Sequence, residues 1–258
     1  MIQTKSSPAR ASAARKTTLP AGSAKGAAMA DHIVSAFTDE LDKIAADLMR
    51  MGGIVETMIL DSCLAVDRND HNLAKDVISR DPSVDRLEEE VERQIVSLIA
   101  RRQPMAHDLR SVFAALKTAG ELERIGDLSK NIGKRTLMLD DSVPSNMRHG
   151  VARMARPVSL QLHSVLDAYA TSNAETAKTV WESDDDIDQH YNSLFREMIT
   201  YMIEDPRTIG AGAHMLFMAK NLERIGDHCT NIAEFIYFQI TGEYLMPHER
   251  PKSPNTGV

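Results

Sequence analysis

Two stretches of this chain repeat each other: ELERIGDLSKNI at residues 121–132 and NLERIGDHCTNI at residues 221–232. They match at eight of twelve positions, at an offset of 100 residues. A second pair lies upstream, DPSVD at residues 81–85 and DDDID at residues 184–188, at an offset of 103. Because both stretches recur in the same order, the sequence predicts two structural repeats in tandem.

Apolar side chains around these stretches recur at helical spacing. The longest stripe advances in steps of four and three and predicts one long helix; it runs through Phe37, Leu41, Ile44, Leu48, Met51, Val55 and Met58. A second helix is expected to begin at Asp81 and Pro82, because Asp is a good N-cap and Pro is favoured at the first helical position. A third helix carries residues 121–132, and the same three-helix pattern follows after residue 145. The predicted fold class is therefore all-α, a tandem repeat of two three-helix bundles with six long helices.

The helical patterns set the expected organisation of the chain. Residues 1–30 lack periodicity and are rich in Ala, Ser, Lys and Gly, which is typical of a disordered basic extension. The first repeat is expected over residues 31–140 and the second over residues 146–245, with a linker between them. Residues 246–258 contain three prolines and are expected to form a loose tail.

Composition and charge exclude several classes of protein. Of the formal net charge of −7, the first 28 residues contribute +5, so the remainder carries −12 and repels nucleic acid. The only two cysteines, Cys63 and Cys229, support neither a disulfide framework nor a thiolate metal site. No stretch reaches the roughly 20 apolar residues that cross a bilayer. These features favour a protein of the cytoplasm that does not insert into a membrane.

Acidic pairs are the main candidates for chemistry. Each half has two acid-x-x-x-acid pairs, one at the expected start of its second helix and one inside its third. Spacing of i, i+4 puts both carboxylates on one helix face, where they repel each other by roughly 0.2 to 0.5 kcal/mol. Oxygen ligands without thiolates suit hard cations such as Mg²⁺, Mn²⁺ or iron. The candidate metal ligands are Asp81, Asp85, Glu123 and Asp127 in the first half, and Asp184, Asp188, Glu223 and Asp227 in the second.

Simpler explanations exist for each pair taken alone. Asp81 could be a helix N-cap, and Asp184 could merely complement the helix dipole beside a capping box of Ser183 and Asp186. The inner pair of the first half could be neutralised by Arg110, Arg124 or Lys130. Gly126 and Gly226 each cost about 1 kcal/mol inside a helix, which close helix packing or a ligand would offset. Recurrence of the whole set in both halves favours the metal hypothesis.

Signatures of common enzymes are missing from the sequence. It contains no Glu-x-x-His, no phosphate-binding glycine loop and no nucleophile elbow. Two alternatives to a non-enzymatic role stay open: a metalloenzyme whose carboxylate-bridged metals hydrolyse phosphate esters or handle oxygen, and a bundle that stores metal.

The duplicated Leu-Glu-Arg-Ile-Gly-Asp, each copy followed by Asn-Ile, resembles the PhoU family, as do the outer acid pairs and the stretch PMAHDLR at residues 104–110. The resemblance covers about residues 31–245. It implies a six-helix protein with pseudo-twofold symmetry and carboxylate-bound metal clusters. It also implies a cytoplasmic, commonly homodimeric negative regulator of the phosphate-starvation response, which links the ATPase of a phosphate ABC transporter to a sensor histidine kinase.

Carried onto this chain, the resemblance assigns the eight acidic residues to two metal sites, one in each half. It adds Asn131 and Asn231 as residues that line them. Glu121 corresponds to Asn221, so the two sites are not expected to have the same charge or affinity.

Overall fold

The computed structural model describes the backbone of residues 22–140 and 143–246, and the side chains of residues 36–140, 143–183 and 186–246. The chain divides into two units, with the boundary between residues 38 and 39. Residues 1–21, most of the expected basic extension, and residues 247–258, nearly all of the expected tail, lie outside the described residues. Helix α1 includes residues 22–30 and continues into the second unit.

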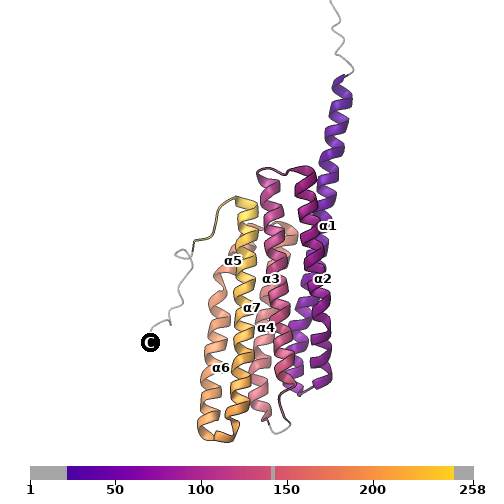
Figure 1. Cartoon of the computed structure of the whole chain (residues 1–258). Helices are drawn as coiled ribbons and strands as arrows, with labels where there is room; N and C mark the ends of the chain where they lie inside the picture. Colours follow the sequence, from indigo (N-terminus) through magenta and orange to yellow (C-terminus); the bar gives the residue numbers. More distant parts are fainter. Residues whose placement is uncertain (1–21, 141–142, 247–258) are drawn as a thin grey trace, which may run out of the picture. The chain divides into compact units, whose positions relative to one another are not determined.

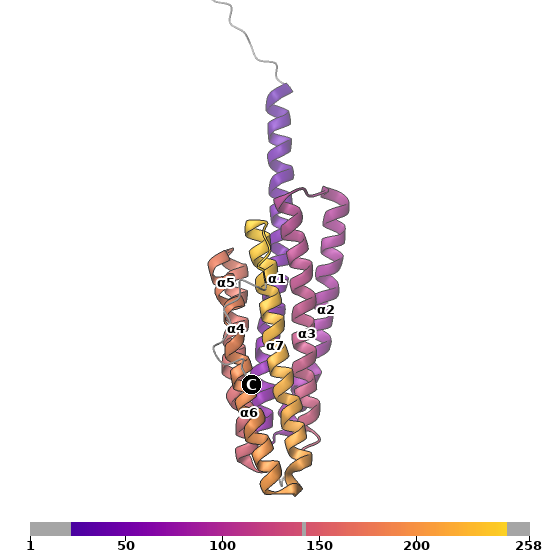
Figure 2. The ribbon, with the colours of Figure 1, turned by 90° about the vertical axis from the view of Figure 1, so that its left-hand side faces the viewer.

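The described residues form helices joined by short connections, and no strand occurs among them. Within the second unit the helices run side by side (Figures 1 and 2). Their bounds are α1 Gly22–Arg68, α2 His71–Arg102, α3 His107–Thr136, α4 Ser145–Thr171, α5 Ala174–Glu182, α6 Asp184–Glu204, the 3₁₀ helix η1 Pro206–Thr208 and α7 Ile209–Thr241. The predicted all-α tandem bundle is confirmed.

The two repeats use the same three-helix plan, with one difference in the second helix. Helices α1, α2 and α3 make the first repeat, and α4, α5 with α6, and α7 make the second. The segment from α5 to α6 corresponds to α2 at the offset of 103, but its helix is interrupted at Ser183. The helix expected to begin at the acid pair of residues 184–188 is α6, and α5 precedes it as a separate helix that was not predicted.

The predicted start of the second helix at Asp81 is wrong. Helix α2 begins at His71, where Asp70 is the N-cap and accepts hydrogen bonds from the backbone amides of Asn72 at 2.9 Å and Leu73 at 3.0 Å. Asp81 lies in the middle of the helix with only 6% of its surface exposed. Helix α2 continues through Pro82. A proline there removes one backbone hydrogen bond, and the turns on either side keep theirs.

Helices α3 and α7, which carry the duplicated motif, pack against each other in the second unit. Helix α3 also packs on α2, and α7 also packs on α4, α5 and α6. Gly126 permits a close approach in the first repeat, since a Cβ there would lie 3.3 Å from Cγ1 of Val84 on α2. At Gly226 a Cβ would lie 3.0 Å from Cδ1 of Ile187 on α6, so close helix packing accounts for both glycines.

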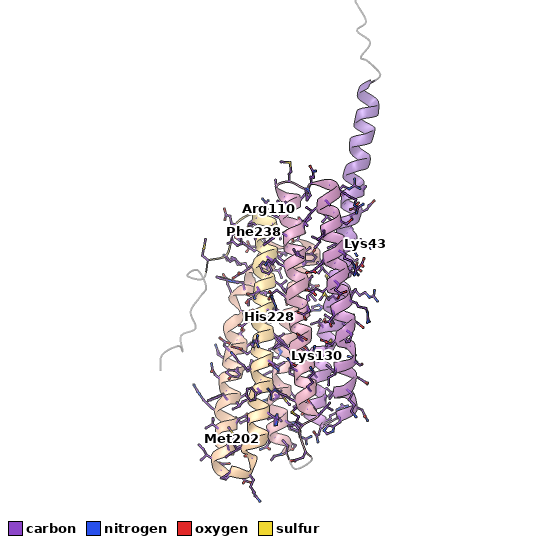
Figure 3. The ribbon with its side chains drawn as sticks, viewed as in Figure 1. Lys43, Arg110, Lys130, Met202, His228 and Phe238 are labelled. Atoms are coloured by element: carbon purple, nitrogen blue, oxygen red, sulfur yellow. The ribbon has the colours of Figure 1, made fainter. Side chains whose placement is uncertain are left out.

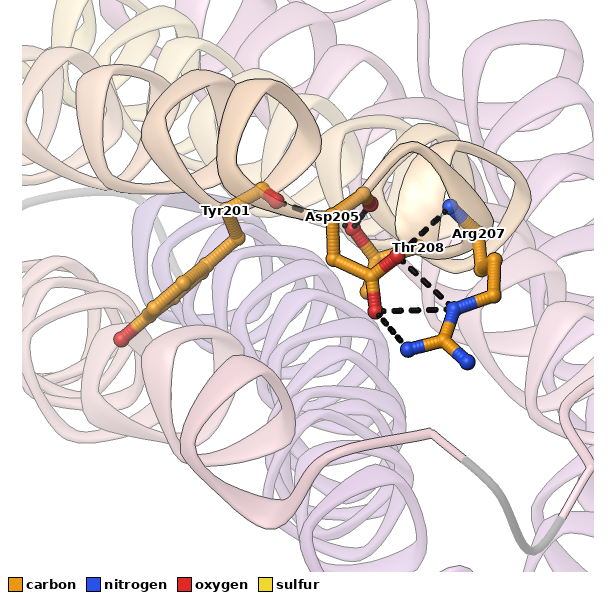
Figure 4. A network of polar contacts seen from close by, with 4 residues as sticks. All are labelled: Tyr201, Asp205, Arg207 and Thr208. Atoms are coloured by element: carbon orange, nitrogen blue, oxygen red, sulfur yellow. Dashed lines mark hydrogen bonds and ion pairs between the residues drawn. The ribbon is translucent and has the colours of Figure 1, made fainter.

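A short polar network closes the turn between α6 and α7 (Figure 4). The carboxylate of Asp205 accepts hydrogen bonds from the backbone amide of Arg207 at 3.1 Å and from its Nε at 2.9 Å. The Thr208 hydroxyl donates to the carbonyl of Tyr201 at 3.1 Å. These bonds satisfy backbone groups at the end of α6, so the chain reverses directly into α7.

Among the described residues, no helix combines the length and the apolar character that a membrane span needs.

Candidate metal centre

The four candidate ligands of each repeat are called its acid row. The first acid row, made of Asp81, Asp85, Glu123 and Asp127, lies at the contact between α2 and α3. The Nζ atom of Lys130 on α3 donates a hydrogen bond to Oδ2 of Asp81 on α2 at 2.6 Å, and another to Oδ1 of Asp127 on its own helix. Figure 3 shows Lys130 on α3 among the surrounding side chains. The structure therefore brings the outer and inner pairs of the first repeat together, with a lysine ammonium between two of the four carboxylates.

The other carboxylates of this row repel one another. Burial raises the pKa of Asp85, and the charges of Asp81 and Asp127 raise it further, against the opposing effect of Lys130. Burial also raises the pKa of Glu123, with contributions from Asp127, Glu88 and Asp85. Proximity of like charges disfavours the ionised form, so this end of the row has an excess of negative charge.

Glu88 belongs to the same row, although it is not among the metal ligands predicted from the sequence. Burial raises its pKa, and the neighbouring charges of Glu92, Asp85 and Glu89 act in the same direction. Its position three residues after Asp85 puts it on the same face of α2, and this spacing is the signal in the sequence that could have identified it.

The second row is arranged differently. Lys220 forms an ion pair with Oε1 of Glu223, and its ammonium lies 5.4 Å from the ring centroid of Tyr191. Burial lowers the pKa of Lys220, but the hydrogen bond to Glu223 and the charges of Glu223 and Asp227 outweigh it, so the pKa is raised. Asp188 is half-buried, and the side chain of Asp184 lies outside the described residues.

The donors of both rows suit a hard cation by their chemistry. The second row also has an unpaired acceptor, because Oε2 of Glu223 is buried and has no hydrogen-bond partner among the described residues. In the placement seen, no three His, Cys, Asp or Glu side chains of the described chain surround a common point as a metal would require. Lys130 instead pairs with Asp81 and Asp127, and Lys220 pairs with Glu223.

A separate polar contact joins the two repeats between α3 and α7. Oε2 of Glu121 lies 2.6 Å from Nδ1 of His228 and accepts a hydrogen bond from Nδ2 of Asn231 at 3.0 Å. Figure 3 shows His228 on α7. Asn231 therefore binds a carboxylate of the other repeat, whereas its counterpart Asn131 is exposed. Glu121 and its counterpart Asn221 were expected to make the charges of the two metal sites differ. The structure places Glu121 at the contact between the repeats.

Fold and site together define a class of protein: a tandem helical bundle whose repeats each place carboxylates on their second and third helices. The family model of the PhoU domain matches residues 48–136 and again residues 151–236, one match in each repeat. The chain belongs to the PhoU family.

Curated relatives and solved structures agree with this assignment. The chain is 50% identical over 225 residues to the "phosphate-specific transport system accessory protein PhoU homolog" of Caulobacter vibrioides, a match that covers 87% of this chain and 97% of the relative. It is 39% identical to the Escherichia coli K12 accessory protein PhoU, covering 82% and 88%. The crystal structure of PhoU from Pseudomonas aeruginosa superposes with a TM-score of 0.74 at 33% identity, covering 80% of this chain and all of that one.

Proposed function

We propose that this chain is the accessory regulator of a phosphate-specific transport system and that it acts by binding partners, not by catalysis. The observation that carries the proposal is the PhoU-domain match in both repeats, together with relatives that are named as accessory proteins of phosphate transport. In this role it links the ATPase of the phosphate ABC transporter to the phosphate-sensing histidine kinase in the cytoplasm. It represses the phosphate-starvation response and phosphate uptake when phosphate is plentiful.

The fold supports binding rather than chemistry. Helices packed along their length present long faces to partners, and one such face on α6 carries the exposed side chains of Phe195, Ile199 and Ile203. Exposed apolar side chains spaced four residues apart suit a partner helix or a second copy of this chain. A homodimer that binds the ATPase and the kinase in alternation is the proposed assembly.

The two acid rows are the proposed metal sites of this regulator. Asp81, Asp85, Glu123 and Asp127 would hold cations in the first repeat, and Asp184, Asp188, Glu223 and Asp227 in the second. Iron, Mn²⁺ and Mg²⁺ are the candidates, because the donors are carboxylate oxygens. A bound cation would neutralise the repulsion between the carboxylates of one row and would stabilise the packing of the second helix of that repeat against the third.

Deletion of the gene tests the regulatory role. In cells grown with abundant phosphate, deletion is expected to raise the expression of phosphate-regulated genes, measured with a reporter fusion. Expression of the intact chain from a plasmid is expected to restore repression, and expression of an unrelated helical protein at the same level serves as the control. Unchanged reporter expression after deletion would overturn the regulatory proposal.

A separate assay tests the absence of catalysis. Protein loaded with Mn²⁺ or iron is expected to hydrolyse no phosphoester above the rate of the free metal. A turnover that disappears in both Glu123→Gln and Glu223→Gln would favour a metalloenzyme. Elemental analysis of protein purified without chelator distinguishes a small fixed number of ions per chain from the many ions of a storage protein.

A further inference from the structure

The two repeats position their lysines at opposite ends of the inner acid pair. Lys130 follows Asp127 by three residues, and the corresponding residue of the second repeat is Thr230. Lys220 precedes Glu223 by three residues, and its counterpart in the first repeat is Gly120. Each repeat therefore has one lysine beside its acid row, but the two lysines approach the rows from opposite ends.

The lysines also differ in what they hold. Lys130 bridges two helices, because it binds the buried Asp81 of α2 and Asp127 of α3. Lys220 pairs with Glu223 of its own helix and lies over the ring of Tyr191, which corresponds to Glu88 of the first repeat. The ammonium of Lys130 thus lies between the facing acid pairs of its repeat, whereas the ammonium of Lys220 pairs with a carboxylate of its own helix.

We propose that Lys130 is the resident counter-ion of the first acid row, and that a divalent cation occupies this row only by displacing it. The second row, where Oε2 of Glu223 is buried without a hydrogen-bond partner among the described residues, accepts a divalent cation first. This inference rests on the metal sites of the proposed function and adds that the two repeats bind metal with unequal affinity.

Simple electrostatics supports this order. An ammonium that binds Asp81 and Asp127 occupies two of the predicted oxygen ligands and repels a second cation at short range. Because only 18% of the Lys130 side chain and 9% of the Asp81 side chain is exposed, water screens this repulsion less than at the surface. Lys220 pairs with Oε1 of Glu223 and not with Oε2, so it competes less with a cation for the second row.

Binding of Mn²⁺ to defined variants tests the proposal. The second row is first removed with the double variant Glu223→Gln, Asp227→Asn, so that any remaining Mn²⁺ binds in the first repeat; isothermal titration and electron paramagnetic resonance measure it. Lys130→Met in this background is expected to bind Mn²⁺ at least about tenfold more tightly. Lys130→Gln keeps a hydrogen-bond donor near Asp81 without the charge. It is also expected to bind Mn²⁺ more tightly.

Lys134→Met is the matched control, because Lys134 is an exposed lysine on the same helix. It removes the same charge from the chain and is expected to change the affinity by less than about twofold, as for a screened surface charge. Equal effects of Lys130→Met and Lys134→Met would overturn the displacement. Circular dichroism confirms that each variant is folded before titration.

The outcomes separate this inference from the metal sites themselves. If the unaltered chain binds Mn²⁺ but the Lys130 variants bind it no more tightly, displacement is overturned and the metal sites stand. If, in the background without the second row, only the Lys130 variants bind Mn²⁺, displacement is supported and the first row with its lysine holds no metal. If neither binds Mn²⁺, both are overturned, while the regulatory role is still judged by the gene deletion.

Discussion

Oε2 of Glu121 lies 2.6 Å from Nδ1 of His228, so a carboxylate of the first repeat is held by an imidazole of the second. The reciprocal contact is missing from the duplicated motif, because Asn221 and Leu128 occupy the corresponding positions. The pseudo-symmetric pair of helices α3 and α7 is therefore joined by one polar contact of this kind, on one side only. Loss of this contact should weaken the packing of the repeats.

Glu121→Gln should lower the free energy of unfolding at pH 7 by about 1–2 kcal/mol, since it replaces charge-assisted hydrogen bonds in a buried site. Burial acts to raise the pKa of Glu121, but the hydrogen bonds from His228 and Asn231 outweigh it and lower the pKa. A lowered carboxyl pKa contributes stability above the unfolded-state pKa and loses it as pH falls through the folded-state pKa.

Urea unfolding at pH 7 and under increasingly acidic conditions measures this effect. The difference between the native chain and Glu121→Gln is expected to shrink as the pH falls below the ordinary glutamate value of 4.5. Glu204→Gln, at an exposed position on α6, serves as the control and should stay within about 0.5 kcal/mol of the native chain. A difference that is constant across pH would contradict the ionic character of this contact.

Pro82→Ala should stabilise the protein. A proline inside a helix removes a backbone hydrogen bond and costs about 3 kcal/mol in an unadapted helix, so relief of part of this cost predicts a gain of about 1–3 kcal/mol. Pro206→Ala is the matched control, because Pro206 occupies the first turn of η1, where proline is favourable. Denaturant unfolding measures both, and a loss of stability in Pro82→Ala would show that the proline is part of an adapted bend.

Most of the fold could be predicted from the sequence, because helical spacing and a duplicated motif are both local signals. The start of α2 could not be predicted, because an Asp-Pro pair looks the same at a helix start and inside a helix. Only the turns packed around Pro82 distinguish the two cases. The start of α6 at Asp184 agrees with the helix start expected at residues 184–188, whereas α5 before it was not predicted. The acidic residues of the first row were found because their spacing is regular, whereas the reach of Lys130 to Asp81 requires knowledge of how α2 and α3 face each other.

The glycines offer a test of close helix packing. A Cβ at Gly53 on α1 would meet no described atom within 4 Å, so Gly53→Ala should stabilise the protein by about 0.5–1 kcal/mol through helix propensity. A Cβ at Gly226 would lie 3.0 Å from Cδ1 of Ile187 and 3.3 Å from Oε1 of Gln161. Gly226→Ala should therefore be at least about 1 kcal/mol less stable than Gly53→Ala in parallel thermal melts. Equal stability of the two variants would contradict tight packing at Gly226.

Glu123→Gln should have opposite effects without and with metal. Burial and the charges of Asp127, Glu88 and Asp85 raise the pKa of Glu123, so ionisation disfavours the folded state at pH above the raised folded-state pKa. In chelator at pH 7 the variant is expected to gain about 0.2–0.5 kcal/mol, and this gain should disappear as the pH falls through the folded-state pKa toward the unfolded-state value.

With Mn²⁺ at a concentration high enough to displace Lys130, the same substitution removes a ligand of the first row, so the cation should raise the melting temperature of the native chain more than that of Glu123→Gln. Glu175→Gln, at an exposed position on α5, is the control and should follow the native chain in both conditions. A variant that is less stable than the native chain in chelator would mean that Glu123 is held by a favourable partner. An equal response to Mn²⁺ in both chains would remove Glu123 from the metal site, because a ligand cannot be lost without lowering the stabilisation that binding provides.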